Sequence, residues 1–108
     1  MQRHMKVKIQ YSPGSLQDLD DIWSYISLEL CNPDAAENTV NNILDTIDLL
    51  ADFPESGALL IHHVNIETNY RYITSGNYIG FYRFENNIIY VDRILYAKRD
   101  YTKLLELK

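Results

Sequence analysis

The sequence has little of what marks secreted, membrane-spanning or disulfide-stabilised proteins. It contains a single cysteine, Cys31, which excludes an internal disulfide and fits a reducing compartment. No apolar run approaches the roughly 20 residues of a membrane span, and the first residues lead into no signal-peptide core. We therefore expect a cytoplasmic protein that does not enter a membrane.

Motifs for the common catalytic and cofactor chemistries are also missing. There is no glycine-rich phosphate loop, no Ser-His-Asp order, no zinc-ligand spacing and no carboxylate pair. His62 and His63 are adjacent, so their side chains point apart on a strand and form a weak chelate. Cys31 has no histidine or acid in register, which makes it a small apolar residue rather than a nucleophile. We expect neither a metal nor a cofactor.

The composition is that of one small folded domain. The chain has 108 residues, of which 46% are hydrophobic and 12% aromatic, enough for one core and too few residues for two. We expect residues 1–108 to form this domain, with residues 1–5 as a frayed extension. Residues 1–69 carry eleven acids and three bases, whereas residues 70–108 carry seven bases and four acids. An anionic ligand should therefore meet the second half, although the net charge of −5 argues against general nucleic-acid binding.

The first half predicts an edge strand and two helices. Residues 6–11 alternate polar and apolar side chains, and their lysines suit a sheet edge. Ser15 is a candidate N-cap, with Asp18 three residues later. Six apolar residues then follow at helical spacing, and they predict a buried stripe with tryptophan in the core: Leu16, Leu19, Ile22, Trp23, Ile26 and Leu30. After a short turn, Asn32 caps a second helix that begins at Pro33 and runs to about residue 51.

The second half predicts an antiparallel meander. Residues 70–74 and 78–85 flank a Ser-Gly-Asn turn, and Asn86-Asn87 leads into a last strand, in which residues 89–96 alternate with a period of two. Asp100 then caps a short C-terminal helix. The predicted fold is α+β: an N-terminal strand and an antiparallel helical hairpin packed on one face of an antiparallel sheet, with a short C-terminal helix.

Basic residues recur along the meander and directly after it. Arg71, Arg83 and Arg93 fall in successive strands, which lie about 4.8 Å apart, so they can converge with Lys98 and Arg99. Seven of the nine tyrosines, Tyr96 among them, are interleaved with these cations. Such a surface suits stacking on bases or gripping a peptide, while the plainer alternatives are surface tyrosines of high β propensity and a solvated strand end.

Several segments resemble the RelE/ParE family of type II toxin–antitoxin toxins. They are residues 69–73 (NYRYI), 76–83 (GNYIGFYR) and 92–101 (DRILYAKRDY), with residues 19–26 (LDDIWSYI) and 50–57 (LADFPESG) matching the helical hairpin and its exit. The resemblance implies a toxin of a plasmid-stabilisation system, neutralised by a cognate antitoxin whose extended C-terminal segment wraps it. The predicted partners also include a second copy of the chain, in a homodimer.

The family resemblance leaves three functions open. A ParE-like toxin inhibits DNA gyrase by binding it, which we favour, and its target-binding residues would be Arg83, Arg93, Tyr96, Lys98 and Arg99. A RelE-like toxin is a metal-independent endonuclease that cuts mRNA on the ribosome, and its catalytic residues would be Arg71, Arg99 and Tyr101. Against the endonuclease, Ile79 and Leu105 stand where RelE has an active-site arginine and a late tyrosine. An inactive, toxin-like binding module is the third reading.

Overall fold

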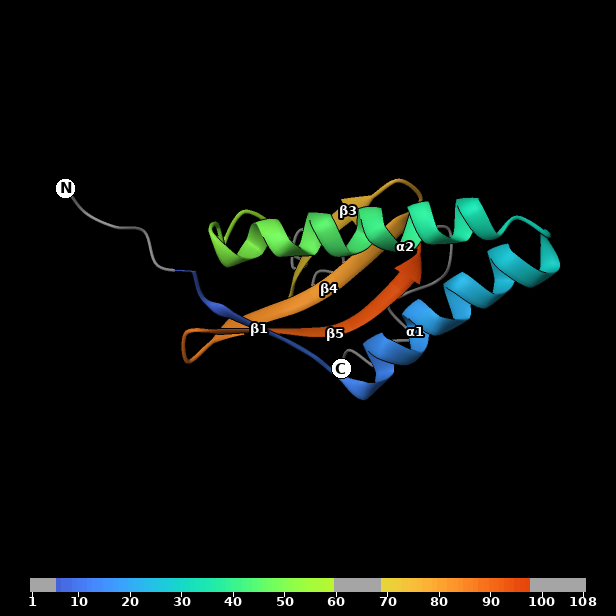
Figure 1. Cartoon of the computed structure of the whole chain (residues 1–108). Coiled ribbons are helices and arrows are strands. Elements are labelled where there is room, and N and C mark those ends of the chain that lie inside the picture. Colours follow the sequence, from blue (N-terminus) through green and yellow to red (C-terminus); the bar gives the residue numbers. More distant parts are fainter. Residues whose placement is uncertain (1–5, 60–68, 98–108) are drawn as a thin grey trace.

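Two helices cover one face of a five-stranded sheet in the computed structural model, which describes residues 6–59 and 69–97 (Figure 1). This arrangement confirms the predicted α+β class. In chain order the elements are β1 (Lys8–Tyr11), α1 (Pro13–Ser24), the π-helical turn η1 (Tyr25–Glu29), α2 (Pro33–Asp48), the 3₁₀ turn η2 (Leu49–Ala51), β2 (Ala58–Leu59), β3 (Arg71–Ser75), β4 (Tyr78–Glu85) and β5 (Ile88–Tyr96). None of the helices in these two ranges is long and apolar enough to cross a bilayer.

The sheet order is β1-β5-β4-β3-β2. The predicted meander is confirmed, because β3, β4 and β5 pair in antiparallel fashion through the two expected turns. β1 lies at an edge, as predicted, but it runs parallel to β5, so the sheet is mixed rather than wholly antiparallel. The helical hairpin provides the long connection that parallel strands need. The two-residue strand β2 was not predicted, since so short a strand leaves no periodic pattern.

The first helix begins earlier than the sequence suggested. Ser12, not Ser15, is the N-cap, and its Oγ accepts a hydrogen bond from the Ser15 amide at 2.9 Å. Pro13 then occupies the first helical position, where its missing N–H costs nothing. The prediction of Ser15 as the cap is wrong because Ser15 is fully buried and its hydroxyl donates to the Ser12 carbonyl.

Only part of the predicted apolar stripe of α1 is buried. Leu19, Ile22 and Ile26 face the sheet, whereas Trp23 is 41% exposed. Leu16 and Leu30, each seven residues from Trp23, are also exposed, so these three define an outer stripe. The prediction of Trp23 in the core is wrong because the sheet contacts a narrower face of the helix than its apolar residues span.

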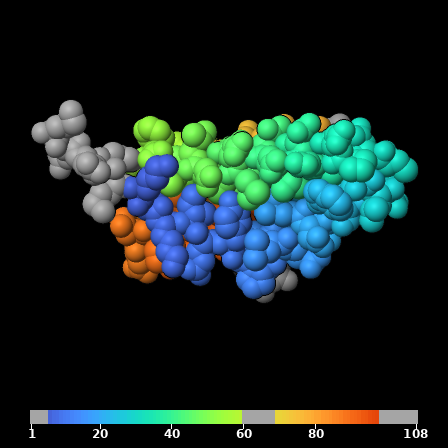
Figure 2. Space-filling model, in the orientation of Figure 1, coloured from blue at the N-terminus to red at the C-terminus, as the bar shows by residue number. Residues whose placement is uncertain are grey.

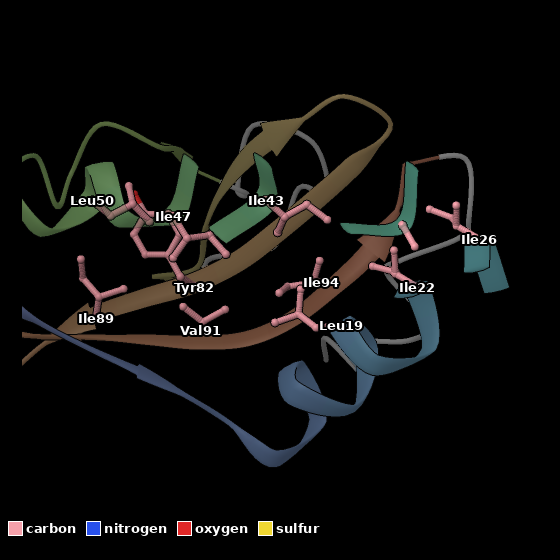
Figure 3. Packing of buried hydrophobic residues seen from close by; sticks show 11 residues of the cluster. Leu19, Ile22, Ile26, Ile43, Ile47, Leu50, Tyr82, Ile89, Val91 and Ile94 are labelled. Carbon is pink, nitrogen blue, oxygen red and sulfur yellow. The ribbon is translucent and has the colours of Figure 1, made fainter. Parts of the chain in front are cut away.

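The core lies between the helices and the sheet (Figure 3). α2 contributes Ile43 and Ile47, and the sheet contributes Tyr82, Ile89 and Val91. Burying a side chain of this size is worth about 1.5–3 kcal/mol. Figure 2 shows α1 and α2 side by side over this core, with part of the sheet (orange) still visible beside the N-terminal segment (blue).

A β-bulge in β5 changes which side chains reach the core. Phe81 of β4 pairs with Arg93 and Tyr82 pairs with Val91, which leaves Asp92 as the extra residue. Strict alternation along a strand would place Ile94 on the face opposite to Val91. The bulge reverses the alternation, and Ile94 joins Val91 under the helices.

Candidate functional site

The first of the three sheet arginines, Arg71, binds the loop that follows α2. Its Nη1 donates to the carbonyl oxygens of Glu55 at 3.1 Å and Gly57 at 2.8 Å. The Glu55 carboxylate lies 3.9 Å from its Nη2. Because Arg71 pairs across the sheet with Tyr82, a core residue, its side chain starts on the helical side of the sheet.

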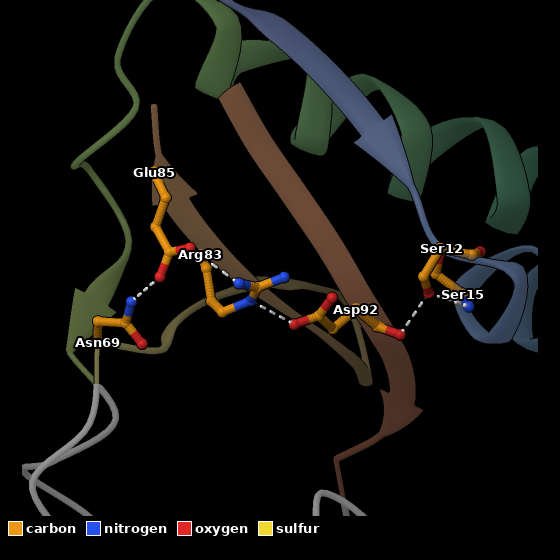
Figure 4. Close-up of polar contacts among 6 residues, drawn as sticks. All are labelled: Ser12, Ser15, Asn69, Arg83, Glu85 and Asp92. Atoms are coloured by element: carbon orange, nitrogen blue, oxygen red, sulfur yellow. Dashed lines mark hydrogen bonds and ion pairs between the residues drawn. The ribbon is translucent and has the colours of Figure 1, made fainter. Parts of the chain in front are cut away.

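Arg83 lies on the opposite side, because successive residues of a strand alternate between faces. Its Nε donates to Asp92 at 2.9 Å and its Nη1 to Glu85 at 3.0 Å (Figure 4). The Tyr90 ring lies 5.0 Å from the guanidinium carbon, within cation–π range. The hydrogen bond to Asp92 raises the pKa of Arg83 further above its ordinary value.

The acids around Arg83 have further partners. Glu85 accepts from the Asn69 side-chain amide, and the backbone carbonyl of Asp92 accepts from Ser12 Oγ at 2.7 Å, so the chain of contacts reaches the start of α1 (Figure 4). Burial raises the pKa of Tyr70 to about 12, and a side-chain hydrogen bond to Asp92 is the second cause of this increase. Among the described residues, no buried side-chain nitrogen or oxygen of this cluster lacks a hydrogen-bond partner.

Arg93 is held by α1. Its Nε and Nη2 donate to the two carboxylate oxygens of Asp18 at 2.8 and 2.9 Å, a bidentate pair. The Ile94 amide donates to the same carboxylate at 2.8 Å. The hydrogen bond to Asp18 raises the pKa of Arg93. Asp18 is therefore a structural anchor between α1 and β5.

The expected convergence of the arginines on one face is wrong. Arg71 binds the loop after α2, Arg83 a carboxylate pair on the far face and Arg93 a carboxylate of α1. Each acid is supplied by this chain, so the positive charges are neutralised locally. The roles assigned to them in catalysis or target binding stay predictions.

The other predicted site residues divide between two regions. Lys98, Arg99 and Tyr101 lie outside the described residues, as do the predicted C-terminal helix and the His62-His63 pair. Tyr96 is described, at the end of β5, and is 38% exposed. Within residues 6–59 and 69–97, no three His, Cys, Asp or Glu side chains are placed to hold a metal ion.

Tyr96 borders a groove of about 760 Å³ between α1–η1 and the end of the sheet. We call it the β5 groove. On the helical side its walls include Ile22, Tyr25 and Ile26, and on the sheet side they include Tyr78. Its volume falls in the range of ligand-binding clefts, about 300–1,000 Å³.

The aromatic side of the groove is built by β4, β5 and the helix end. The Tyr78 and Tyr96 rings pack edge to face, with centroids 5.7 Å apart. Burial raises the pKa of Tyr78, and the Tyr96 and Tyr25 hydroxyls raise it further. Tyr25 begins the π-helical turn, in which the Leu30 amide donates to the Tyr25 carbonyl at 3.1 Å. Such turns occur often at functional sites.

Sequence reasoning missed both Asp18 and the groove. Asp18 is not part of the predicted apolar stripe, yet Ser15, Asp18 and Ile22 recur at three- and four-residue spacing and are all buried. That spacing is the sequence feature that indicates a buried position for Asp18. The groove has no sequence signal, because it depends on how η1 meets β5.

The fold is shared with solved toxin–antitoxin structures. One is a chain from "Chromosomal ParDE TA system from P. aeruginosa", with a TM-score of 0.73, 21% identity, and coverage of 89% of this chain and 100% of that chain. Another is from the toxin–antitoxin complex RelBE2 of Mycobacterium tuberculosis, with a TM-score of 0.57, 14% identity, and coverage of 91% and 100%. At these identities the likeness establishes the fold alone.

Sequence comparison gives the family. No curated protein matches the chain. The family model described as the ParE toxin of the type II toxin–antitoxin system, parDE, matches residues 9–101, which includes every described strand and helix except Lys8, the first residue of β1. The chain therefore belongs to the ParE toxin family of type II toxin–antitoxin systems.

Proposed function

We propose that this toxin acts in the cytoplasm by binding and inhibiting DNA gyrase and is neutralised by a cognate antitoxin. The neutralised sheet arginines are the observation that carries this proposal. Arg71, Arg83 and Arg93 are all occupied by carboxylates or carbonyls of the same chain. A general acid or base must reach the proton that it transfers. Residues held this way stabilise the fold and are poorly placed to take part in RNA cleavage.

Two residues that stand at RelE active-site positions, Ile79 and Leu105, lack the side chains that RelE has there, and this supports the same proposal. Ile79, which stands where RelE has an active-site arginine, is 9% exposed and pairs with Leu95 across the sheet. It offers no proton donor or acceptor. Since a general acid or base contributes about 10²–10⁴-fold to rate, the loss of one at this position is severe for a nuclease.

Two assays with the purified protein test the proposal. In the first, gyrase, supercoiled plasmid and ATP are incubated with the toxin, and we expect inhibited supercoiling with accumulation of cleaved DNA. Topoisomerase I, which relaxes the same plasmid, should be unaffected. In the second, primer extension on mRNA in a cell-free translation system should show no new cleavage.

The alternatives predict different results in these assays. Unaffected gyrase together with codon-specific mRNA cleavage would replace the proposal with the endonuclease. In that case Arg99→Ala should abolish the cleavage, whereas Arg83→Lys should not, because Arg83 is paired with Asp92 and Glu85. Activity in neither assay, with normal growth on expression, would mark an inactive binding module.

A further inference from the structure

α1 carries an apolar face that neither the core nor the β5 groove uses. Trp23 is 41% exposed and Leu16 is 55% exposed, and neither of them lines the groove. Asp20, which is also exposed, lies four residues after Leu16 and three before Trp23, so the three side chains share one side of the helix. We call this surface the Trp23 face. Leu30, the third residue of the outer stripe, lines the groove and is not part of this face.

The helices around the Trp23 face carry only negative charge. No lysine or arginine occurs between Lys8 and Arg71. α1, η1 and α2 carry seven exposed acids: Asp20, Asp21, Glu29, Asp34, Glu37, Asp45 and Asp48. Figure 2 shows both helices at the surface. Among the described residues, the ion pairs involve none of these seven acids. A binding partner therefore meets an exposed tryptophan with unpaired carboxylates around it.

These charges select the class of partner. Nucleic acids and anionic membranes are themselves negatively charged, and they bind proteins through cations. A second copy of the chain would bring its own Trp23 face, with the same acids, against this one, and like charges across an interface oppose association. A protein surface with an apolar pocket and a rim of lysines or arginines is complementary in both shape and charge. Tryptophan is also among the residues that most often dominate the energy of such interfaces.

We propose that the Trp23 face binds the protein that the toxin inhibits. Trp23 and Leu16 enter an apolar pocket of that protein, and the basic rim of the pocket faces Asp20. This contact adds to the target-binding residues predicted from the sequence, of which Arg83 and Arg93 are already paired within the chain. The identity of the bound protein as gyrase rests on the proposed function, whereas the Trp23 face does not.

Binding of the full chain to immobilised, purified gyrase tests this contact. Trp23→Ala should weaken binding by at least about tenfold, as expected for a tryptophan anchor, and Trp23→Phe should weaken it less because an aromatic ring remains. Leu16→Ala should also weaken binding. Its matched control is Leu49→Ala, because Leu49 is 58% exposed but lies on η2. Asp20→Lys should weaken binding and reduce its dependence on salt, and should do so more than Asp45→Lys, the same charge change at an exposed position of α2.

Growth on induced expression gives a readout that does not depend on the identity of the target. Trp23→Ala and Asp20→Lys should relieve the growth arrest that the wild type causes, whereas Leu49→Ala and Asp45→Lys should leave it unchanged. Equal protein levels on immunoblots and unchanged circular dichroism spectra would show that the variants fold.

The possible outcomes separate this inference from the proposed function. Full toxicity of Trp23→Ala, or equal effects of the variants and their matched controls, would overturn the inference. Dimerisation of the wild type that Trp23→Ala abolishes would also overturn it, because the face would then bind a second copy. Growth arrest that requires Trp23, from a protein that does not bind gyrase, would refute the proposed target and leave this surface standing. A wild type that neither binds gyrase nor arrests growth would refute both.

Discussion

Removal of the Asp18 carboxylate should be among the most damaging polar substitutions in the described part of the chain. In Asp18→Ala, Arg93 loses both of its hydrogen bonds and the Ile94 amide loses its acceptor. The Asp18 side chain is 9% exposed, so these groups are largely shielded from replacement by water. The variant therefore leaves a cation and a backbone donor unsatisfied at the junction of α1 and β5.

The magnitude follows from the burial of the two partners. Breaking a fully buried ion pair from one side costs about 3–5 kcal/mol. The Arg93 side chain is 33% exposed and can regain some hydration, which lowers our expectation to about 2–4 kcal/mol. For a domain of this size, that loss lowers the Tm by about 10–20 °C.

Urea unfolding followed by circular dichroism would measure this loss. Asp20→Ala, on the same helix but exposed, is the matched control and should change the free energy of unfolding by less than about 0.5 kcal/mol. Arg93→Met and the double variant complete a double-mutant cycle, in which we expect a coupling of about 1–3 kcal/mol. A loss below about 1 kcal/mol for Asp18→Ala, or additive effects in the cycle, would refute the anchoring role of Asp18.

Three further predictions concern Tyr82, its neighbour Gly57, and Tyr70. Tyr82→Phe should cost about 1–3 kcal/mol in urea unfolding, because the Tyr82 hydroxyl accepts from the Gly57 amide and donates to the Pro54 carbonyl, both at 2.9 Å; no loss would contradict these bonds. Gly57→Ala should destabilise by at least about 1–3 kcal/mol, since its Cβ would lie 2.5 Å from Tyr82 Oη, and a neutral result would mean that the loop moves freely. The Tyr70 hydroxyl, near Asp92, has its pKa raised from 10.0 to about 12, so the folded state keeps its proton where the unfolded state has lost it. Its contribution to stability is therefore complete below about pH 10 and is lost as the pH rises through about 12, and Tyr70→Phe should flatten that decline in pH-dependent urea unfolding.

Most of the architecture was predictable because it depends on local patterns. Asn32 caps the second helix and Pro33 opens it, as predicted, because both preferences act within one turn. The tight Asn86-Asn87 turn is also confirmed, with both residues at positive φ. Such features need no knowledge of the rest of the molecule.

The errors occur where distant segments meet. Asp18 is a charged residue outside the predicted apolar stripe, yet it is buried and pairs with Arg93, 75 positions away. The bulge at Asp92 moves Ile94 into the core. The alternation of side chains along β5 does not predict this extra residue. The arginine prediction fails for the same reason. The spacing of the strands determines how close Arg71, Arg83 and Arg93 can lie. It does not determine which carboxylates or carbonyls each arginine binds.

The pairing of the sheet arginines with groups of this chain affects which cations can bind a target. Within residues 6–59 and 69–97 there are five basic and twelve acidic side chains, and the three sheet arginines are held by the protein itself. The basic character of the second half of the sequence therefore depends on Lys98, Arg99 and the lysines that follow them. A cation that is already paired must break that pair to bind a target, whereas an unpaired one gives its full attraction. The target-binding prediction is consequently weakest for Arg83 and Arg93, each of which is already paired with a carboxylate of this chain.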